Sequence, residues 1–160
     1  MAGGDASNYY LSYSYIYKGH KEEANVISEQ VKATWTSDVK IVVHWDNKIM
    51  NKLDSSGKEK RLPVVISGSK GSKLLEAPSI GSSLKGIYRR KTAESVVKLL
   101  EDWSCGDDVF GCVFDTTASN TVRLNGACLN MQKLLNRTLL WFPCRHHIGE
   151  LIVNKVLYGT

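Results

Sequence analysis

Residues 109–120, Val-Phe-Gly-Cys-Val-Phe-Asp-Thr-Thr-Ala-Ser-Asn, set the fold of this chain. The first six residues are mostly apolar, β-branched or aromatic, which predicts a short buried strand. The run stops at Asp115, and the small hydroxyl residues that follow are typical of a loop. In open α/β sheets, functional groups gather just beyond the carboxyl ends of parallel strands, which makes Asp115 a candidate site residue. The alternative is that Asp115 caps the N-terminus of a following helix.

A second informative stretch covers residues 39–50. Its β-branched start indicates a central strand. We expect Asp46 to lie inside this strand, where an unpaired charge is strongly unfavourable. Asp46 therefore needs a cationic partner, and Lys48, two residues on and on the same face of the strand, is one candidate. His44 shares this face, either as a hydrogen-bond donor beside the acid or as a packed strand histidine.

The apolar periodicity of the rest of the chain predicts further helices and strands. The helices are expected over residues 20–35, 92–103, 124–135 and 148–157, and the strands over residues 61–67, 74–80 and 138–143. Thr92 is expected to cap its helix. The strand over residues 61–67 is expected to form an antiparallel hairpin with the strand over residues 39–50, and residues 1–19 are expected to form a flexible arm.

This order of elements predicts an α/β fold of the RNase H-like type, covering residues 20–160. The expected sheet is five-stranded and mixed, with three antiparallel strands followed by parallel ones, helices at its sides and an additional N-terminal helix. In that fold the first and fourth strands are neighbours, so Asp46 and Asp115 would face each other. Two like charges at such short range need a counter-ion, and carboxylate oxygens suit Mg²⁺ or Mn²⁺. A pair of such ions activates water or a 3′-hydroxyl and stabilises the leaving oxygen at phosphorus.

Composition indicates a globular domain that favours an acidic partner. The chain has 160 residues and a net charge of +5, from 21 Lys and Arg against 16 Asp and Glu. Such a balance favours a polyanionic partner, but many small basic domains bind nothing acidic. The candidate contacts to a nucleic-acid backbone are Lys70, Lys73, Arg89, Arg90 and Arg145. A solvated basic face is the alternative, whereas the glycine spacing over residues 68–86 does not match a phosphate-binding P-loop.

Several classes of protein are disfavoured by simple patterns. The four cysteines form no C-x-x-C pair, which predicts reduced thiols of an intracellular protein rather than a disulfide framework. The first 17 residues lack a charged start followed by an apolar block, so no signal peptide is predicted. No apolar run reaches the length of a membrane span.

Three blocks of the sequence resemble the catalytic domain of DDE-type DNA transposases. They are His-Trp-Asp-Asn-Lys at residues 44–48, Phe-Asp-Thr-Thr-Ala-Ser-Asn-Thr at residues 114–121 and Cys-Arg-His-His at residues 144–147. The C-x-x-H pattern of the third block makes the chain most similar to the hAT-like group of cut-and-paste elements. The resemblance runs from about residue 39 to the end of the chain. Asn47 and Val122 depart from it, because Gly is expected at both positions.

The resemblance implies roles for residues in each block. Asp46 and Asp115 would be the first two catalytic acids and would bind Mg²⁺ or Mn²⁺. Cys144 and His147 would be the C-x-x-H pair, which shapes the active site or contacts DNA. The resemblance also implies DNA as the partner, a nuclear location and possible homo-oligomers.

The third acid is open. In hAT-like enzymes it follows a long helical insertion, which would begin about where this chain stops, so the chain is expected to be truncated and its metal site incomplete. The competing candidate is Glu150, on the last predicted helix and one turn from His147. Two other uses of this segment are a zinc site of Cys144, His146 and His147, and Cys144 as a nucleophile with a histidine base.

Two function classes follow from these patterns. The first is an enzyme that cleaves or transfers DNA strands with a divalent metal, and it is active only if a third acid is supplied. The second is a non-catalytic nucleic-acid-binding module or domesticated transposon relic. For this chain we expect a transposase origin with little or no activity.

Overall fold

The structure is a computed structural model that describes residues 12–52, 57–81 and 85–159. The chain divides into two compact units, Met1–Thr36 and Ser37–Thr160. Of the arm expected over residues 1–19, residues 1–11 lie outside the described part of the chain.

The described part of the first unit is dominated by one helix, α1 (Tyr13–Thr34). The predicted helix is confirmed, but it begins earlier than residue 20 and includes residues expected in the arm. Its first turn is capped by Ser12, whose hydroxyl accepts a hydrogen bond from the backbone N–H of Tyr15 at 3.2 Å. The rings of Tyr13 and Tyr17, one turn apart, stack with centroids 6.4 Å apart. Capping and ring stacking extend the helix beyond the apolar pattern from which it was predicted.

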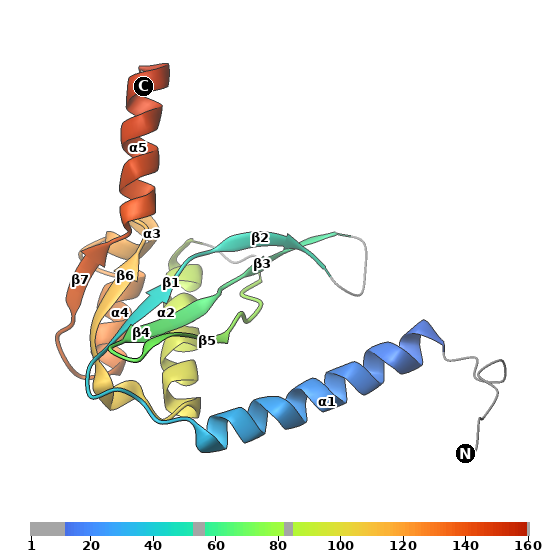
Figure 1. The fold of residues 1–160 in the computed structure, drawn as a ribbon. Helices are drawn as coiled ribbons and strands as arrows, with labels where there is room; N and C mark the ends of the chain where they lie inside the picture. The colour runs from blue at the N-terminus through green and yellow to red at the C-terminus, as the bar shows by residue number, and fades with distance from the viewer. Residues whose placement is uncertain (1–11, 53–56, 82–84, 160) are drawn as a thin grey trace, which may run out of the picture. The chain divides into compact units, whose positions relative to one another are not determined.

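The second unit is built on a five-stranded mixed sheet with the strand order β5-β4-β1-β6-β7 (Figure 1). Its strands are β1 (Ile41–Trp45), β4 (Val64–Gly68), β5 (Gly71–Glu76), β6 (Val109–Phe114) and β7 (Leu140–Pro143). β4 runs antiparallel to both β1 and β5, whereas β6 runs parallel to both β1 and β7. The predicted α/β class, with antiparallel and parallel strands in one five-stranded sheet and with helices, is confirmed.

A second sheet, which the sequence analysis missed, is formed by β2 (Lys48–Asn51) and β3 (Lys58–Arg61). The prediction of one strand over residues 39–50 is therefore wrong, because the chain breaks at residues 46–47 and pairs again in β2. The two strands are antiparallel, and part of the segment that joins them, residues 53–56, lies outside the described residues. All of β2 is exposed and β3 is exposed or half-buried, so neither strand shows the apolar alternation that marks a strand on a core.

One face of the main sheet is covered by helices α2 (Lys85–Asp102) and α4 (Ala127–Leu134), which pack on each other behind it (Figure 1). Alternate residues of β1, namely Ile41, Val43 and Trp45, are buried on this face. Strand side chains alternate between faces, so apolar residues at every second position create one buried layer. The core of the second unit lies between this layer and the two helices.

The opposite face of the sheet is open among the described residues. One row of paired residues crosses all five strands on this face: Leu74, Val65, His44, Val113 and Phe142. None of these five residues is buried. The candidate site described below lies at one end of this open face.

Thr92 does not cap a helix as predicted. It lies inside α2, and its hydroxyl donates a hydrogen bond to the backbone carbonyl of Tyr88 at 3.0 Å. Its side chain is buried in the core. Threonine can bond to the carbonyl four residues earlier within a helix, so its presence does not by itself mark a helix start.

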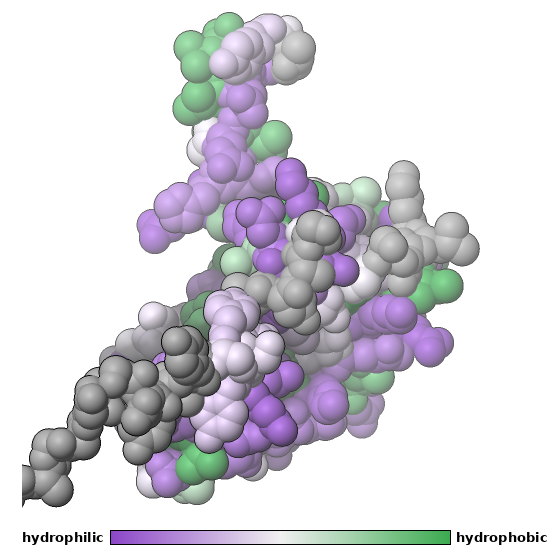
Figure 2. Space-filling view, turned by 90° about the vertical axis from the view of Figure 1, so that its right-hand side faces the viewer, coloured by the Kyte–Doolittle hydropathy of each residue, from purple (hydrophilic) through white to green (hydrophobic). Residues whose placement is uncertain are grey.

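The other predicted elements are present with shifted ends. The expected strands over residues 61–67, 74–80 and 138–143 are β4, β5 and β7, and the expected helices over residues 124–135 and 148–157 are α4 and α5 (Arg145–Tyr158). Two short elements were not predicted: the 3₁₀ helix η2 (Gly106–Asp108) before β6 and the helix α3 (Ala118–Thr121) after it. α5 stands away from the sheet, and apolar side chains such as Leu151, Ile152 and Val156 are exposed along it (Figure 2).

All four cysteines are free thiols; Cys105, Cys112 and Cys128 are buried and Cys144 is partly exposed. Burial raises the pKa of the Cys105 thiol to about 11 and also raises that of Cys128, so both stay protonated near neutral pH. None of the helices within the described ranges combines the length and the apolar character that crossing a bilayer needs.

Candidate functional site

The candidate site begins at the carboxyl ends of two neighbouring parallel strands, β1 and β6. Their register pairs His44 with Val113. Asp46 and Asp115 lie two positions after this pair, and each directly follows the last residue of its strand. Because strand side chains alternate between faces, both carboxylates continue the row on the open face. The fold thus brings together two acids that are far apart in the sequence.

Asp46 does not lie inside a strand, as the sequence analysis predicted. β1 ends at Trp45, whose buried ring stacks on that of Phe114 with centroids 5.6 Å apart. The next side chain, that of Asp46, is 51% exposed. The acid therefore remains in contact with water, and burial is not the reason for its partner.

Both acids line one open pocket with a volume of about 550 Å³. Its other polar lining residues are His44, Lys48, Cys144, His146, His147 and Glu150. The rest of its wall is apolar and includes Val65 of β4 and Val113 of β6. Residues from all three sequence blocks therefore meet at this pocket.

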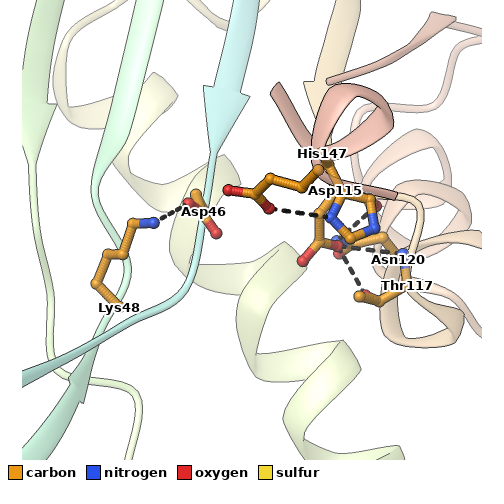
Figure 3. Close-up of polar contacts among 7 residues, drawn as sticks. Asp46, Lys48, Asp115, Thr117, Asn120 and His147 are labelled. Atoms are coloured by element: carbon orange, nitrogen blue, oxygen red, sulfur yellow. Dashed lines mark hydrogen bonds and ion pairs between the residues drawn. The ribbon is translucent and has the colours of Figure 1, made fainter. Parts of the chain in front are cut away.

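The carboxylate of Asp115 is held by the loop that follows it (Figure 3). Its Oδ1 accepts hydrogen bonds from the hydroxyl of Thr117 at 2.7 Å and from Nδ2 of Asn120 at 2.6 Å. A third bond comes from the backbone N–H of Thr117 at 3.3 Å. All three fall on Oδ1, so Oδ2 is the oxygen left for a ligand. The helix-cap alternative for Asp115 is wrong, because Thr117 is the N-cap residue of α3.

Asn120 connects the carboxyl ends of β1 and β6 through hydrogen bonds. No role was predicted for it from the sequence. Its side chain is only 2% exposed. It accepts a hydrogen bond at Oδ1 from Nε1 of Trp45 at 3.2 Å, while its Nδ2 donates to Asp115. One amide therefore connects the last residue of β1 to the acid after β6. The sequence shows an Asn five positions after Asp115. Its other partner, Trp45, is 75 residues away, and that spacing does not reveal the contact.

Asp46 is paired with Lys48 at 2.8 Å between Oδ2 and Nζ, as predicted (Figure 3). The hydrogen bond and the charge of Asp46 raise the pKa of Lys48, with smaller contributions from Glu150 and Cys144. Both side chains of the pair are more than half exposed. Exposed ion pairs of this kind contribute about 0–1 kcal/mol, so a divalent cation can displace Lys48 at small cost.

Tyr88 of α2 is a second residue that the sequence analysis missed. Its pKa is raised mainly by burial and then by the charge of Asp115, with a smaller contribution from Asp46. The negative charge of the two acids therefore disfavours ionisation of Tyr88, which is not among the residues that line their pocket. The sequence carried no signal for this role, because Tyr88 lies before the residues that were predicted to form the helix.

The C-x-x-H pair lies beside the acids. Cys144 follows β7 and is the N-cap residue of α5, and its backbone N–H donates to the carbonyl of Phe114 at 2.9 Å. His147 lies in the first turn of α5, with Nδ1 at 3.9 Å from Oε2 of Glu150. Cys144, His147 and Glu150 all line the pocket. The structure therefore places the pair, and the candidate third acid, next to Asp46 and Asp115.

The side chain of His44 forms its hydrogen bond within the main sheet. Its Nε2 lies 2.6 Å from the hydroxyl oxygen of Ser67 on β4. Burial lowers the pKa of His44, so the ring is neutral near pH 7. The bond to Ser67 favours a packed strand histidine over a donor to Asp46.

The pocket is lined by two aspartate carboxylates, and the described residues provide no third metal-binding side chain close enough to both. Within the described ranges, no three His, Cys, Asp or Glu side chains converge closely enough to hold a metal ion. This applies to the set of Asp46, Asp115 and Glu150 and also to the zinc alternative. The donor chemistry of the two aspartates still fits a hard divalent ion, since Asp46 already has an ammonium group at 2.8 Å.

The cations predicted to contact DNA do not all gather at the pocket. The backbone N–H of Lys70 donates to Oδ2 of Asp38 at 2.9 Å, and its Nζ lies 3.6 Å from Oδ1. Asp38 precedes β1, so Lys70 lies at the opposite end of this strand from Asp46. Nζ of Lys73 lies 5.4 Å from the centre of the Trp103 ring, on the face that the helices cover.

The arginines predicted to contact DNA lie on two helices. Arg89 donates to Oδ1 of Asn125 at 2.8 Å, and Arg90 pairs with Glu94 within α2 at 2.9 Å. Arg145 is exposed at the start of α5, between two pocket-lining residues. Arg145 is therefore the member of the predicted set that adjoins the site.

No protein-family model matches this chain, and no curated protein sequence matches it. The assignment of a function therefore depends on the geometry of the site.

Proposed function

We propose that residues 37–160 form an RNase H-like domain derived from a DDE-type, hAT-like DNA transposase, and that its site serves metal-dependent cleavage or transfer of DNA strands. One observation carries the proposal: Asp46 and Asp115 directly follow neighbouring parallel strands and line the same pocket. The strand order, with an antiparallel half and a parallel half that share β1, supports the RNase H-like assignment. The natural place of action would be the nucleus.

The residues of the site have separate tasks. Asp46 and Asp115 would hold Mg²⁺ or Mn²⁺, which supplies activation of a water or 3′-hydroxyl and stabilisation of the leaving oxygen. Thr117 and Asn120 hold Oδ1 of Asp115, which keeps Oδ2 directed to the pocket. Lys48 neutralises Asp46 in the absence of another cation.

The third ligand decides whether the domain is catalytic. Glu150 lines the pocket and carries the right chemistry, but its side chain is 75% exposed and pairs with His147. A rotation of this exposed side chain would bring a third carboxylate toward the two aspartates. With Glu150 as a ligand the site is complete, and without it the domain has little or no activity.

Ion binding tests the proposal directly. We expect the full chain to bind Mn²⁺, and Asp46→Asn or Asp115→Asn to weaken this binding at least tenfold, as measured by isothermal titration calorimetry. Asp107→Asn is the matched control, because Asp107 is exposed at the opposite end of β6. Equal Mn²⁺ affinity in the two site variants and the control would contradict a metal site at this pocket.

Glu150→Gln tests the third ligand separately. If Glu150 binds the metal, this change abolishes metal-dependent DNA cleavage and leaves the fold intact, since the side chain is exposed. An unchanged cleavage rate removes Glu150 from the site. Fluorescence-based cleavage of a labelled duplex, with and without Mn²⁺, measures both outcomes.

The alternative is a non-catalytic nucleic-acid-binding module. It is favoured by the lack of three converging ligands within the described residues and by the ion pair that already satisfies Asp46. A module of this kind would bind DNA with a steep salt dependence and would not cleave it in Mg²⁺ or Mn²⁺. DNA affinity measured across a salt series, together with the cleavage assay, separates the two functions.

A further inference from the structure

The two-stranded ribbon of β2 and β3 begins two residues after Asp46 and stands apart from the main sheet (Figure 1). Its root is firmly attached to the second unit. The backbone N–H of Leu62 donates to the carbonyl of Pro78 at 2.9 Å, and that of Ile80 donates to the carbonyl of Lys60 at 3.0 Å. The guanidinium of Arg61 also donates to the carbonyl of Ala77 at 3.1 Å. The ribbon therefore leaves the pocket in a defined direction.

The ribbon is strongly basic. Its described residues 48–52 and 57–61 carry five cationic side chains: Lys48, Lys52, Lys58, Lys60 and Arg61. The one carboxylate among them, Glu59, is already paired with Arg61. Within the described part of the chain, neither Lys52 nor Lys58 forms an ion pair, and both are exposed. Such a surface has a net attraction for a polyanion that its own acids do not cancel.

The root of the ribbon and the site share a residue. Lys48, the first residue of β2, pairs with Asp46 at 2.8 Å and lines the pocket. Nζ of Lys60, on β3, lies 5.3 Å from the centre of the Tyr88 ring. A polyanion lying along the ribbon would therefore pass directly beside the two acids.

The shape of the ribbon indicates the kind of polyanion. The major groove of B-form DNA admits a two-stranded β-ribbon, whereas the major groove of A-form RNA is too narrow for one. Two apolar side chains of β2, Ile49 and Met50, are 66% and 50% exposed among the cations. In a groove they would contact sugars and base edges while the lysines contact phosphates.

We propose that the β2–β3 ribbon is a DNA-binding arm that lies in the major groove of a duplex and leads it to the pocket of Asp46 and Asp115, with Lys52 and Lys58 on its phosphates. This rests on the proposed function, because the acids give the bound duplex its purpose. None of the five cations predicted to contact DNA lies on this ribbon. The sequence pattern pointed instead to the loops and helices further along the chain.

The test is DNA binding by the full chain in a chelator, so that cleavage does not contribute. We compare Lys52→Gln/Lys58→Gln with the control Lys98→Gln/Lys133→Gln, which removes the same charge from exposed positions of α2 and α4. Each phosphate contact contributes about 0.9 to the slope of log affinity against log salt, so the ribbon variant should lower this slope by about 1.8. Its affinity for a short DNA duplex should fall at least tenfold, and the control should change little. Fluorescence anisotropy across a salt series measures both quantities.

Two outcomes would overturn the proposal. Equal losses in the ribbon and control variants would mean that only net charge matters. A loss that is as large for an RNA duplex of the same sequence as for DNA would mean that the ribbon contacts any polyanion and not a DNA groove. Failure of the ribbon is also distinct from failure of the proposed function: the first leaves Mn²⁺ binding sensitive to Asp46→Asn, and the second removes that sensitivity while ribbon-dependent DNA binding persists.

Discussion

The two acids of the site have contrasting surroundings. Asp115 accepts three hydrogen bonds from the loop that follows it, and one of the donors, Asn120, is buried and bonded to the end of β1. Asp46 has one exposed lysine as its partner. One carboxylate is therefore positioned by the fold, whereas the other is held only by an ion pair between two exposed side chains. The carboxylate after β6 is therefore fixed by several hydrogen bonds, whereas the carboxylate after β1 can exchange its single partner.

Asn120→Ala should have the largest effect, because it removes the residue that connects Asp115 to β1. The change leaves Nε1 of buried Trp45 without its partner and removes one of the three hydrogen bonds to Oδ1 of Asp115. An unsatisfied buried group costs about 1–3 kcal/mol. We expect a loss of stability in this range in urea unfolding, together with weaker Mn²⁺ binding. Asn154→Ala, at an exposed position of α5, is the control and should leave both unchanged. Unaltered stability and Mn²⁺ affinity in Asn120→Ala would show that Asn120 does not position the acid.

Thr117→Val separates positioning from stability. Valine has the shape of threonine but cannot donate to Oδ1 of Asp115, so we expect a loss of about 1 kcal/mol or less at this exposed loop. The expected effect on Mn²⁺ affinity is larger than the effect on stability, because Asp115 becomes free to rotate. Thr117→Ser keeps the hydroxyl and should restore Mn²⁺ binding. If Ser and Val bind the ion equally, the hydroxyl has no positioning role.

Lys48→Met tests the ion pair that holds Asp46. The exposed pair contributes about 0–1 kcal/mol, so stability should change little. Mn²⁺ should bind several-fold more tightly, because its competitor at Asp46 is gone. Weaker binding in this variant would mean that Lys48 supports the site instead of competing for it.

The same pair has a defined pH dependence. Asp46 raises the pKa of Lys48 above the ordinary value of 10.5. The stabilisation from this ion pair is therefore fully present below that value and is lost as pH rises through the folded-state pKa of Lys48. The stabilities of the wild type and of Lys48→Met, measured by urea unfolding, should therefore converge as pH rises above 10.5. A difference that stays constant through this alkaline range would contradict the assignment.

The smallest expected effect concerns His44. Its pKa is lowered by burial, so the folded state binds fewer protons than the unfolded state as pH falls below 6.5. The contribution of the neutral ring is present above 6.5 and is lost toward the folded-state pKa. His44→Gln should keep the bond to Ser67 and flatten the stability profile between pH 7 and 5, measured by thermal unfolding in a buffer series. An identical profile in wild type and variant would assign the acid sensitivity to other groups.

The sequence predicted the main sheet and both acids, because these depend on local patterns. A β-branched run marks β1, an apolar run that stops at Asp115 marks β6, and periodic apolar residues mark α2 and α4. The end of β1 before Asp46 was not predicted. The ribbon of β2 and β3 was not predicted because its side chains are mostly exposed. No alternation of apolar and polar residues therefore marks these segments as strands. Thr92 was misassigned because its hydroxyl bonds within the helix, which sequence spacing does not distinguish from a cap.

Short-range patterns of apolar and polar residues were enough to predict the strands of the main sheet and the longer helices, and they singled out Asp46 and Asp115 as candidate acids. They did not show that β1 ends before Asp46. Only the tertiary structure shows the register of the neighbouring strands β1 and β6, the bond between Asn120 and Trp45, and the position of Cys144 at the pocket of the two acids. Contacts of this kind join residues tens of positions apart, and their partners depend on how strands order within the sheet. No local pattern encodes that order, because it minimises the free energy of the whole sheet and its covering helices.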